Sequence, residues 1–222
     1  MMSLTTKLVR QMQRPEGWLG RMNLSRMNKS HSDLTDWGLT HVTIANDATA
    51  LDIGCGGGRT IAKLADRASM GNVYGIDHSP ESVALSRQSN IAAVERGRVD
   101  VRQGSVSQLP FADDTFDLAT AIETHFYWPD LRADMREILR VLKPGGTLVI
   151  VAEVYKGGKH DAAVRKLAAL MAQANTSYAN LTVAEHRALF SDAGYADAQV
   201  VEDYDRGWIC ATGRKTLTLA AV

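Results

Sequence analysis

The sequence of 222 residues has few of the features that mark secreted or membrane-spanning proteins. Its two cysteines, Cys55 and Cys210, are too few for a disulfide framework, and neither has a near cysteine partner for a structural zinc site. No run of about 18 apolar residues could span a membrane. Residues 1–15 lack the apolar segment of a signal peptide. We therefore expect two reduced thiols in a cytoplasmic protein.

The sequence also lacks an excess of either charge. Lysine and arginine number 25, aspartate and glutamate number 25, and the formal net charge is zero. A protein dedicated to holding nucleic acid needs a clear basic excess to contact phosphates. Nucleic acid is therefore disfavoured as a partner, although a local basic patch stays open. Hydrophobic residues make up 45%, which is enough to bury a full core and excludes global disorder.

No internal repeat, low-complexity tract or flexible linker divides the chain, so we expect a single domain over residues 1–222. From residue 49 onward, short apolar runs alternate with helical segments. This alternation is typical of an α/β fold with a mostly parallel sheet covered by helices. The seven runs predicted as strands are 49–53, 72–76, 99–103, 116–122, 147–152, 198–202 and 208–212.

Three helices between the strands have recognisable starts or faces. Residues 59–68 carry apolar side chains at helical spacing. Ser79 can cap the next helix, with Pro80 at its first position. Thr182 and Glu185 form a capping box for a helix that we expect to run to residue 193.

A further helix, 131–142, is followed by Lys-Pro-Gly-Gly at 143–146, which we expect to stop the helix and turn the chain. Two regions lie outside the alternation. Residues 1–45 look helical, and residues 160–178 form an alanine-rich helix inserted after the fifth strand. Both are candidates for a cover over the edge of the sheet where a ligand would bind.

The clearest motif is a glycine-rich loop after the first strand, Leu51-Asp52-Ile53-Gly54-Cys55-Gly56-Gly57-Gly58-Arg59-Thr60. Glycines let the backbone turn sharply and approach a ligand closely. The following helix start adds unpaired N–H groups and a positive dipole end. Asp77 ends the second strand 19 residues after Gly58, where an acid can accept hydrogen bonds from two ribose hydroxyls. A nucleoside site is therefore predicted, and a tight turn without a ligand is the alternative.

The spacing of these glycines does not match a dinucleotide fingerprint. G-x-G-x-x-G would place its last glycine at position 59, where this sequence has Arg59. The sequence reads instead Asp52-x-Gly54-x-Gly56-x-Gly58. An acid two residues before the first glycine suits a ligand with a cationic amino group and no pyrophosphate at that point. This arrangement resembles the class I methyltransferases that use S-adenosylmethionine.

The resemblance covers most of residues 49–214 and includes matching segments at 101–106, 116–121 and 139–146. It implies a Rossmann-like methyltransferase fold, which is a doubly wound, seven-stranded, mostly parallel sheet with strand order 3-2-1-4-5-7-6 and an antiparallel seventh strand. Residues 1–45 would then be a helical N-terminal cover on a cofactor-binding core, with the helix near 160–178 inserted in it.

The resemblance implies S-adenosylmethionine as cofactor, with S-adenosylhomocysteine as product. Asp52 would lie near the methionine ammonium, and Asp77 would bind the ribose. Ser105 stands where the family often has an acid that bonds the adenine amino group. The expected cofactor-binding residues are Asp52, Gly54, Cys55, Gly56, Asp77, His78, Gly104, Ser105, Val106 and Ala121.

The methyl acceptor should lie beyond the carboxyl ends of strands one, four and five. Glu123 is favoured as a functional residue because an acid at a strand's ligand end is costly to desolvate. His31 is a possible general base because its intrinsic pKa lies near neutrality. The expected catalytic residues are Glu123, His31 and Tyr127, and the expected substrate-binding residues are Trp37, His125 and Glu153.

Each of these acceptor-site assignments has a structural alternative. Tyr127 and Trp37 could pack in the core, and His125 could be solvated. Met22 and Met27 could form a soft apolar wall in the cover or ordinary core contacts. Glu123 and Glu153 supply at most two carboxylates after the fourth and fifth strands, so no metal is expected.

The sequence thus predicts a methyltransferase that acts on an oxygen or nitrogen of a small molecule, as a monomer or homodimer. A non-catalytic S-adenosylmethionine-binding protein is an alternative, and so is a methyltransferase acting on a peptide or RNA. A nicotinamide-linked oxidoreductase is disfavoured by Arg59.

Overall fold

The computed structural model describes residues 17, 31–174, 176 and 178–217. Its strands are β1 (Thr49–Ile53), β2 (Asn72–Asp77), β3 (Val99–Gln103), β4 (Phe116–Ile122), β5 (Leu142–Ala152), β6 (Ala196–Asp203) and β7 (Trp208–Arg214). Its helices are α3 (Ser32–Gly38), η1 (Leu39–His41), α4 (Arg59–Arg67), α5 (Pro80–Ser89), α6 (Ile91–Glu95), η2 (His125–Tyr127), α7 (Leu131–Val141), α8 (Asp161–Gln173) and α9 (Val183–Ala193).

The seven strands form one sheet in the order β3-β2-β1-β4-β5-β7-β6. Strands β1 to β5 pair in parallel, and β7 is antiparallel to both β5 and β6. This result confirms the predicted strand order and the Rossmann-like methyltransferase fold. The carboxyl ends of the parallel strands meet at one edge, where ligands bind in open α/β sheets.

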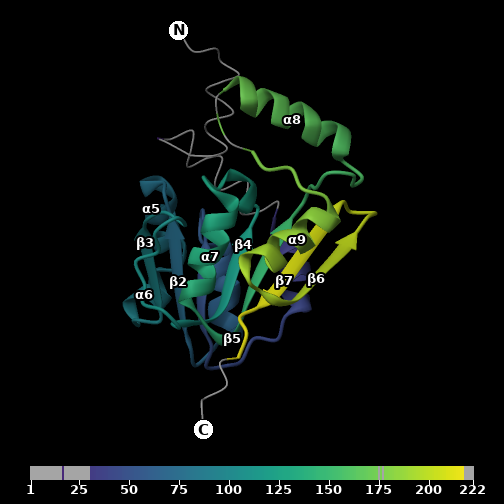
Figure 1. Cartoon of the computed structure of the whole chain (residues 1–222). Helices are drawn as coiled ribbons and strands as arrows, with labels where there is room; N and C mark the ends of the chain where they lie inside the picture. The colour runs from purple at the N-terminus through teal and green to yellow at the C-terminus, as the bar shows by residue number, and fades with distance from the viewer. Residues whose placement is uncertain (1–16, 18–30, 175, 177, 218–222) are drawn as a thin grey trace.

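Side chains alternate between two core layers along the central strands. In β5, Leu148 and Ile150 pack under α7 and α9 with Phe190, whereas Val149 and Val151 pack against α3 and α4 on the opposite face. Figure 1 shows α7 and α9 together on the near face of the sheet. β5 is almost continuously apolar because a central strand of a doubly wound sheet is buried on both faces.

The predicted caps form as the local sequence indicates. Ser79 accepts a hydrogen bond from the backbone N–H of Ser82, with Pro80 at the start of α5. Thr182 and Glu185 form the complete capping box of α9, which ends at Gly194 in the left-handed conformation. Both helices therefore begin where their sequences predict.

The segment 143–146 differs from the prediction. Helix α7 ends at Val141, one residue before the predicted end, and the Lys-Pro-Gly-Gly residues form the first part of β5 and not a separate turn. The register between β4 and β5 shifts at Phe116 and Leu118. A Cβ atom on Gly146 would lie 2.8 Å from the carbonyl oxygen of Phe116. The glycine therefore allows a close, irregular entry into the strand, which the prediction of a turn missed.

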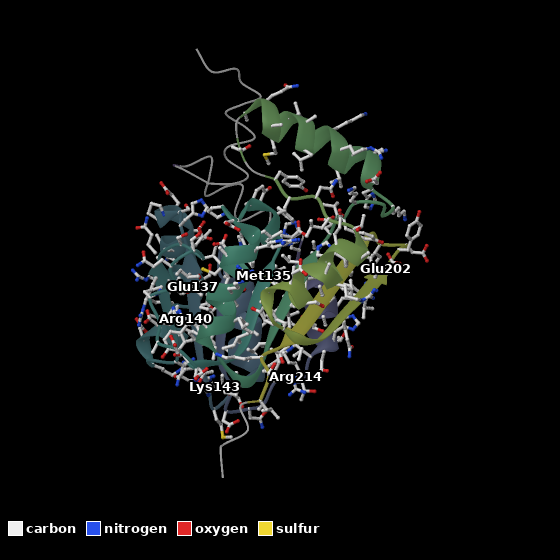
Figure 2. All side chains as sticks on the ribbon, viewed as in Figure 1. Met135, Glu137, Arg140, Lys143, Glu202 and Arg214 are labelled. Atoms are coloured by element: carbon white, nitrogen blue, oxygen red, sulfur yellow. The ribbon has the colours of Figure 1, made fainter. Side chains whose placement is uncertain are left out.

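Arg140 on α7 holds the loop between β3 and β4. Its guanidinium donates to Glu137, to Asp113 and to the carbonyl oxygens of Leu109 and Phe111. Figure 2 shows Glu137 and Arg140 on the same side of α7. These bonds fix the segment after β3, which borders the predicted adenine site.

The two predicted covers take different positions. Helix α3 and the following η1 pack on the sheet face through Leu34 and Leu39, respectively, and His31, just before α3, reaches the carboxyl edge of the sheet. Helix α8 lies beyond that edge, apart from the sheet layers (Figure 1), and buries only Val164 and Met171. No helix within the described residues has the length and apolar character needed to cross a bilayer.

Candidate active site

A pocket opens at the carboxyl ends of β1 and β4, beside the start of α4. It encloses about 500 Å³ of space between atoms, part of it open to solvent. Its walls come from the glycine loop, the end of β4 and the start of α3. The lining residues are His31, Thr35, Asp52, Gly54, Cys55, Gly56, Arg59, Thr60, Ile122, Glu123 and Thr124.

The glycine loop is held against the end of β2. The backbone N–H groups of Gly54 and Cys55 donate to the carbonyl oxygen of Ile76 at 2.8 and 3.1 Å. Gly54 has a φ of 70°, and a Cβ atom there would lie 2.5 Å from Cγ2 of Thr124. Both the backbone conformation and the lack of space require glycine at this position.

Two buried acids flank this loop. Asp52 is 2% exposed and accepts a hydrogen bond from the Thr120 hydroxyl at 2.7 Å. Burial raises the pKa of Asp52 to about 7, and the charge of Asp77 adds to the effect. Asp77 accepts from the backbone N–H groups of Gly56 and Ser79, each at 2.9 Å. Asp77 thus ties the loop to the end of β2, a second role that the predicted ribose contact did not include.

Five other residues predicted to bind the cofactor lie outside the pocket lining, and two of them, His78 and Gly104, contact Asp77. His78 Nδ1 is 3.7 Å from an Asp77 oxygen, and the Gly104 N–H donates to the Asp77 carbonyl. The Ser105 hydroxyl accepts from the backbone of its own loop. Val106 and Ala121 are buried in the core cluster under α7. The cofactor roles of these residues stay predictions.

A cluster of three titratable side chains lies at the pocket, and two of them, His31 and Glu123, line it. His31 Nε2 lies 3.4 Å from an oxygen of Glu153, and the Glu123 carboxylate accepts from the backbone N–H of Glu153. Glu123 has a left-handed φ of 59°, which is strained for a residue other than glycine. The cluster brings together the ends of β4 and β5 with the residue before α3, and it unites three of the predicted acceptor-site residues.

The surroundings shift all three pKa values. Burial raises the pKa of Glu123 to about 7, and the neighbouring His31 opposes this change. Burial lowers the pKa of His31, but the hydrogen bond to Glu153 and the charges of both carboxylates outweigh it, so the pKa is raised. The hydrogen bond to His31 lowers the pKa of Glu153. Groups with such shifted values in a pocket are candidates for proton transfer.

The same cluster has the donor set of a cation site. One ring nitrogen and two carboxylate oxygens lie within 4.8 Å of one another. Sequence reasoning counted only the two carboxylates, because it did not place His31 beside them. The prediction that no metal is needed stays a prediction.

Tyr127 lies in an aromatic group beside the cluster and does not line the pocket. Its ring contacts Phe126 and Tyr178 at centroid distances of 4.6 and 5.8 Å. Burial raises the pKa of both tyrosines, and the charge of Glu123 adds to it. Their hydroxyls therefore stay protonated and can donate hydrogen bonds, but a catalytic role for Tyr127 stays a prediction.

Two predicted substrate-binding residues also lie away from the pocket. Trp37 packs against His41 and Trp208 at 4.8 and 5.7 Å between ring centroids. His125 is 2% exposed and contacts His186. The predicted cover residues Met22, Asn23, Met27 and Asn28 lie outside the described residues.

Sequence reasoning did not select several pocket residues. Thr35 and Thr124 line the pocket, as does Arg59, which had been used only to argue against a dinucleotide site. Thr124 directly follows Glu123, so its position after β4 could have indicated it. Thr35 is one helical turn from His31 and donates to its carbonyl oxygen at 2.8 Å, a relation visible only once α3 is placed.

Comparison with known proteins agrees with this geometry. Residues 51–150 match a family model described as a methyltransferase domain. The chain is 37% identical over 111 residues to an O-methyltransferase of Pyrenophora dematioidea, covering 50% of this chain and 41% of that protein. It is 35% identical over 133 residues to a demethylmenaquinone methyltransferase of Lactiplantibacillus plantarum, covering 57% and 56%. The chain thus spans about half the length of the curated relatives it matches.

Solved structures show the same fold. A chain in the complex of the Haloferax volcanii Trm112 activator with a methyltransferase superposes with a TM-score of 0.75 at 23% identity, covering 90% of this chain and 96% of that chain. A SAM-dependent methyltransferase of Aquifex aeolicus superposes with a TM-score of 0.70 at 20% identity, covering 88% and 98%. At these identities the likeness concerns the fold alone.

Proposed function

Because this chain belongs to the class I S-adenosylmethionine-dependent methyltransferases, we propose that it transfers a methyl group to an oxygen or nitrogen of a small-molecule acceptor. The observation that carries the proposal is the cluster of Glu123, His31 and Glu153 beside the glycine-loop pocket. A non-catalytic protein that only binds the cofactor has no use for a proton acceptor beside the pocket, and the raised pKa of Glu123 makes it a candidate for that role.

The glycine-loop side of the pocket fits the cofactor. When bound, S-adenosylmethionine supplies an activated methyl group for in-line displacement. The buried carboxyl of Asp52 would face a cationic amino group, and an opposite charge favours the ionised form of an acid whose pKa is otherwise about 7. Asp77, which holds Gly56 through one oxygen, would accept from the ribose hydroxyls.

The charges around the pocket indicate the class of acceptor. Glu123 and Glu153 lie beside His31, and the Arg59 guanidinium also lines the pocket, 3.4 Å from the Ser32 hydroxyl. Because the two acids face a guanidinium and an imidazole whose pKa is raised, the charges nearly balance, which suits an uncharged acceptor. An uncharged hydroxyl or an amine fits, and the similarity to a protein named an O-methyltransferase supports oxygen.

Glu123 is the residue best suited to accept the acceptor's proton. A general base works best when its pKa lies near the operating pH, and burial raises the pKa of Glu123 to about 7. The Glu123 carboxylate would take the O–H or N–H proton of the acceptor as the methyl group passes from the cofactor sulfur to that oxygen or nitrogen. His31, paired with Glu153, is the second group able to take a proton there.

Glu123→Gln tests this role. The amide keeps the oxygen that accepts from the Glu153 N–H but cannot act as a base, so turnover should fall about 100-fold or more while affinity for S-adenosylhomocysteine stays within about twofold. Turnover is measured with methyl-labelled cofactor against a panel of phenols, alcohols and amines. The control is Glu95→Gln, an exposed acid at the end of α6. Equal turnover in Glu123→Gln and the control would exclude Glu123 as the base.

A further inference from the structure

A buried pair of histidines lies next to the candidate site, and neither ring lines the pocket. His125 in η2 and His186 in α9 are 2% and 1% exposed, and their Nε2 atoms lie 3.1 Å apart. The two residues are 61 positions apart in the sequence. The pair is thus a tertiary contact between the end of β4 and the C-terminal helix.

The hydrogen bonds define where each proton must be. His186 Nδ1 lies 2.9 Å from the carbonyl oxygen of Thr182, and a carbonyl can only accept, so Nδ1 carries the hydrogen. Neutral His186 then has a lone pair on Nε2. His125 must donate from its own Nε2, which leaves His125 Nδ1 as an acceptor. That atom is buried without a hydrogen-bond partner within the described part of the chain.

Both rings are neutral in this arrangement. Burial lowers the pKa of His125 and of His186, and the neighbouring ring lowers that of His125 further. Phe126 and Trp128 contact the His125 ring, and the Thr182 carbonyl contacts the His186 ring. The Thr182 contact and the charge of Glu185 act to raise the pKa of His186, but burial outweighs them. The stable state is therefore a hydrogen bond between two neutral rings, in which His125 donates and His186 accepts.

The pair connects α9 with the segment that carries Glu123 and Tyr127. Other bonds hold this segment to the sheet, since the Glu123 N–H donates to Val151 and the Thr124 hydroxyl donates to Ile53. The Phe126 carbonyl accepts from Ala179. The hydrogen bond between the His125 and His186 rings joins η2 to α9. A change at His186 would therefore be transmitted to residues on both sides of His125.

We propose that His186 is a positioning residue for methyl transfer, which holds Glu123 and Tyr127 in place through the directed hydrogen bond from His125. This proposal rests on the function proposed above. His186 itself is absent from the pocket lining, so its effect must pass through η2. A displacement of about 1 Å in a catalytic group can cost about 100-fold in rate, so a single anchoring bond is enough to matter.

The test compares His186→Phe with His186→Gln. Phenylalanine removes the acceptor, and kcat should fall by about 10- to 100-fold. Glutamine has a carbonyl oxygen within reach of His125 Nε2 and should restore kcat to within a few-fold of the original. The dissociation constant of S-adenosylhomocysteine, measured by calorimetry, should stay within about twofold in both variants, because the glycine loop is not attached to α9. Equal kcat values for the original protein and His186→Phe would overturn the proposal.

Leu189→Ala separates positioning from general destabilisation. Leu189 is 6% exposed in the same helix and packs in the core cluster under α7, with an apolar side chain that cannot form a hydrogen bond with His125. Its truncation should lower Tm at least as much as His186→Phe does, with kcat nearly unchanged. If Leu189→Ala loses kcat to the same extent, His186 acts only through stability and the positioning role fails.

The proton positions can be observed directly. Nitrogen-15 NMR of the histidine rings at pH 7.5 should show His125 protonated on Nε2 and His186 protonated on Nδ1, both neutral. The opposite tautomers, or an imidazolium at either residue, would contradict the pairing. Absence of methyl transfer by the original protein on every acceptor would refute the proposed function, and with it the kinetic role, while the tautomers would still report on the hydrogen bond.

Discussion

At the scale of single residues, the pocket joins two acids, Asp52 and Glu123, whose pKa values burial raises to about 7. The dependence of cofactor affinity on pH should report most directly on the ionisation of Asp52. Its pKa is raised from 3.8 to about 7, so it is mostly protonated at pH 6 and mostly ionised at pH 8. A ligand with a cationic amino group prefers the ionised form, so a proton must leave for the ligand to bind at low pH.

The affinity for S-adenosylhomocysteine should therefore rise by about tenfold between pH 6 and pH 8. Calorimetry at constant ionic strength measures this slope. Asp52→Asn cannot ionise and should bind weakly with a flatter pH profile, which separates Asp52 from the other groups that titrate in the pocket. An equally steep profile in Asp52→Asn would assign the slope to those other groups.

The parts of the site that could be predicted from the sequence are those formed by residues that are neighbours in the chain. A strand, glycines and a helix start follow one another at 49–60, and Glu123 directly follows β4, so their places at the carboxyl edge are evident from the sequence. The contact of His31 with Glu153, and that of His125 with His186, depend on how α3 and α9 pack. No local pattern encodes those contacts, so His125 was grouped with the pocket although it pairs with a distant helix.

At the scale of secondary-structure elements, α3 is placed by one close contact. Gly38 faces Val151 on β5, and a Cβ atom at Gly38 would lie 2.4 Å from Cγ2 of Val151. Such overpacking in a core typically costs about 1–3 kcal/mol. Because α3 begins one residue after His31, a shift of this helix also changes the cluster at the pocket entrance.

Gly38→Ala should lower the free energy of unfolding by about 1–2 kcal/mol, since alanine's better helix propensity offsets part of the clash. It should also reduce turnover, because His31 moves relative to Glu153. Urea denaturation and the labelled-methyl assay measure the two effects. Asp33→Asn, at an exposed position of the same helix, is the matched control and should change stability by no more than about 0.5 kcal/mol. A fully stable Gly38→Ala protein would show that α3 is not held by this contact.

The pattern of apolar residues predicted the strands of the sheet well. All seven strands were predicted, because central strands of a parallel sheet are apolar runs bounded by helices. The prediction failed at 143–146, where proline and glycine are read as a turn from local sequence. In the structure these residues belong to β5 but lie in a register irregularity, between Leu142, which pairs with Phe116, and Thr147, which pairs with Leu118.

At the scale of the whole molecule, fold and pocket together predict which cofactor stabilises the protein. A ligand present at about 100 times its dissociation constant adds about 2.7 kcal/mol to the stability of the state that binds it. For a chain of this size, that corresponds to a Tm increase of roughly 5 to 10 °C. S-adenosylhomocysteine should produce such a shift in a thermal scan.

NAD is the comparison ligand for that scan and should leave Tm unchanged, because Arg59 stands where the dinucleotide fingerprint has its last glycine. Adenosine alone serves as a control for the nucleoside part and should give a smaller shift. A larger shift with NAD than with S-adenosylhomocysteine would contradict the assignment of the cofactor.

The position of β7 has a consequence for how the protein is made. This strand lies between β5 and β6, although it follows both in the sequence. While a ribosome is still synthesising residues 208–214, the apolar strand β5 has no neighbour on one side, and an unpaired hydrophobic strand can associate with other chains. The sheet is completed only once residues 208–214 have emerged, so a chaperone that covers the open edge of β5 until then should raise the yield of folded protein.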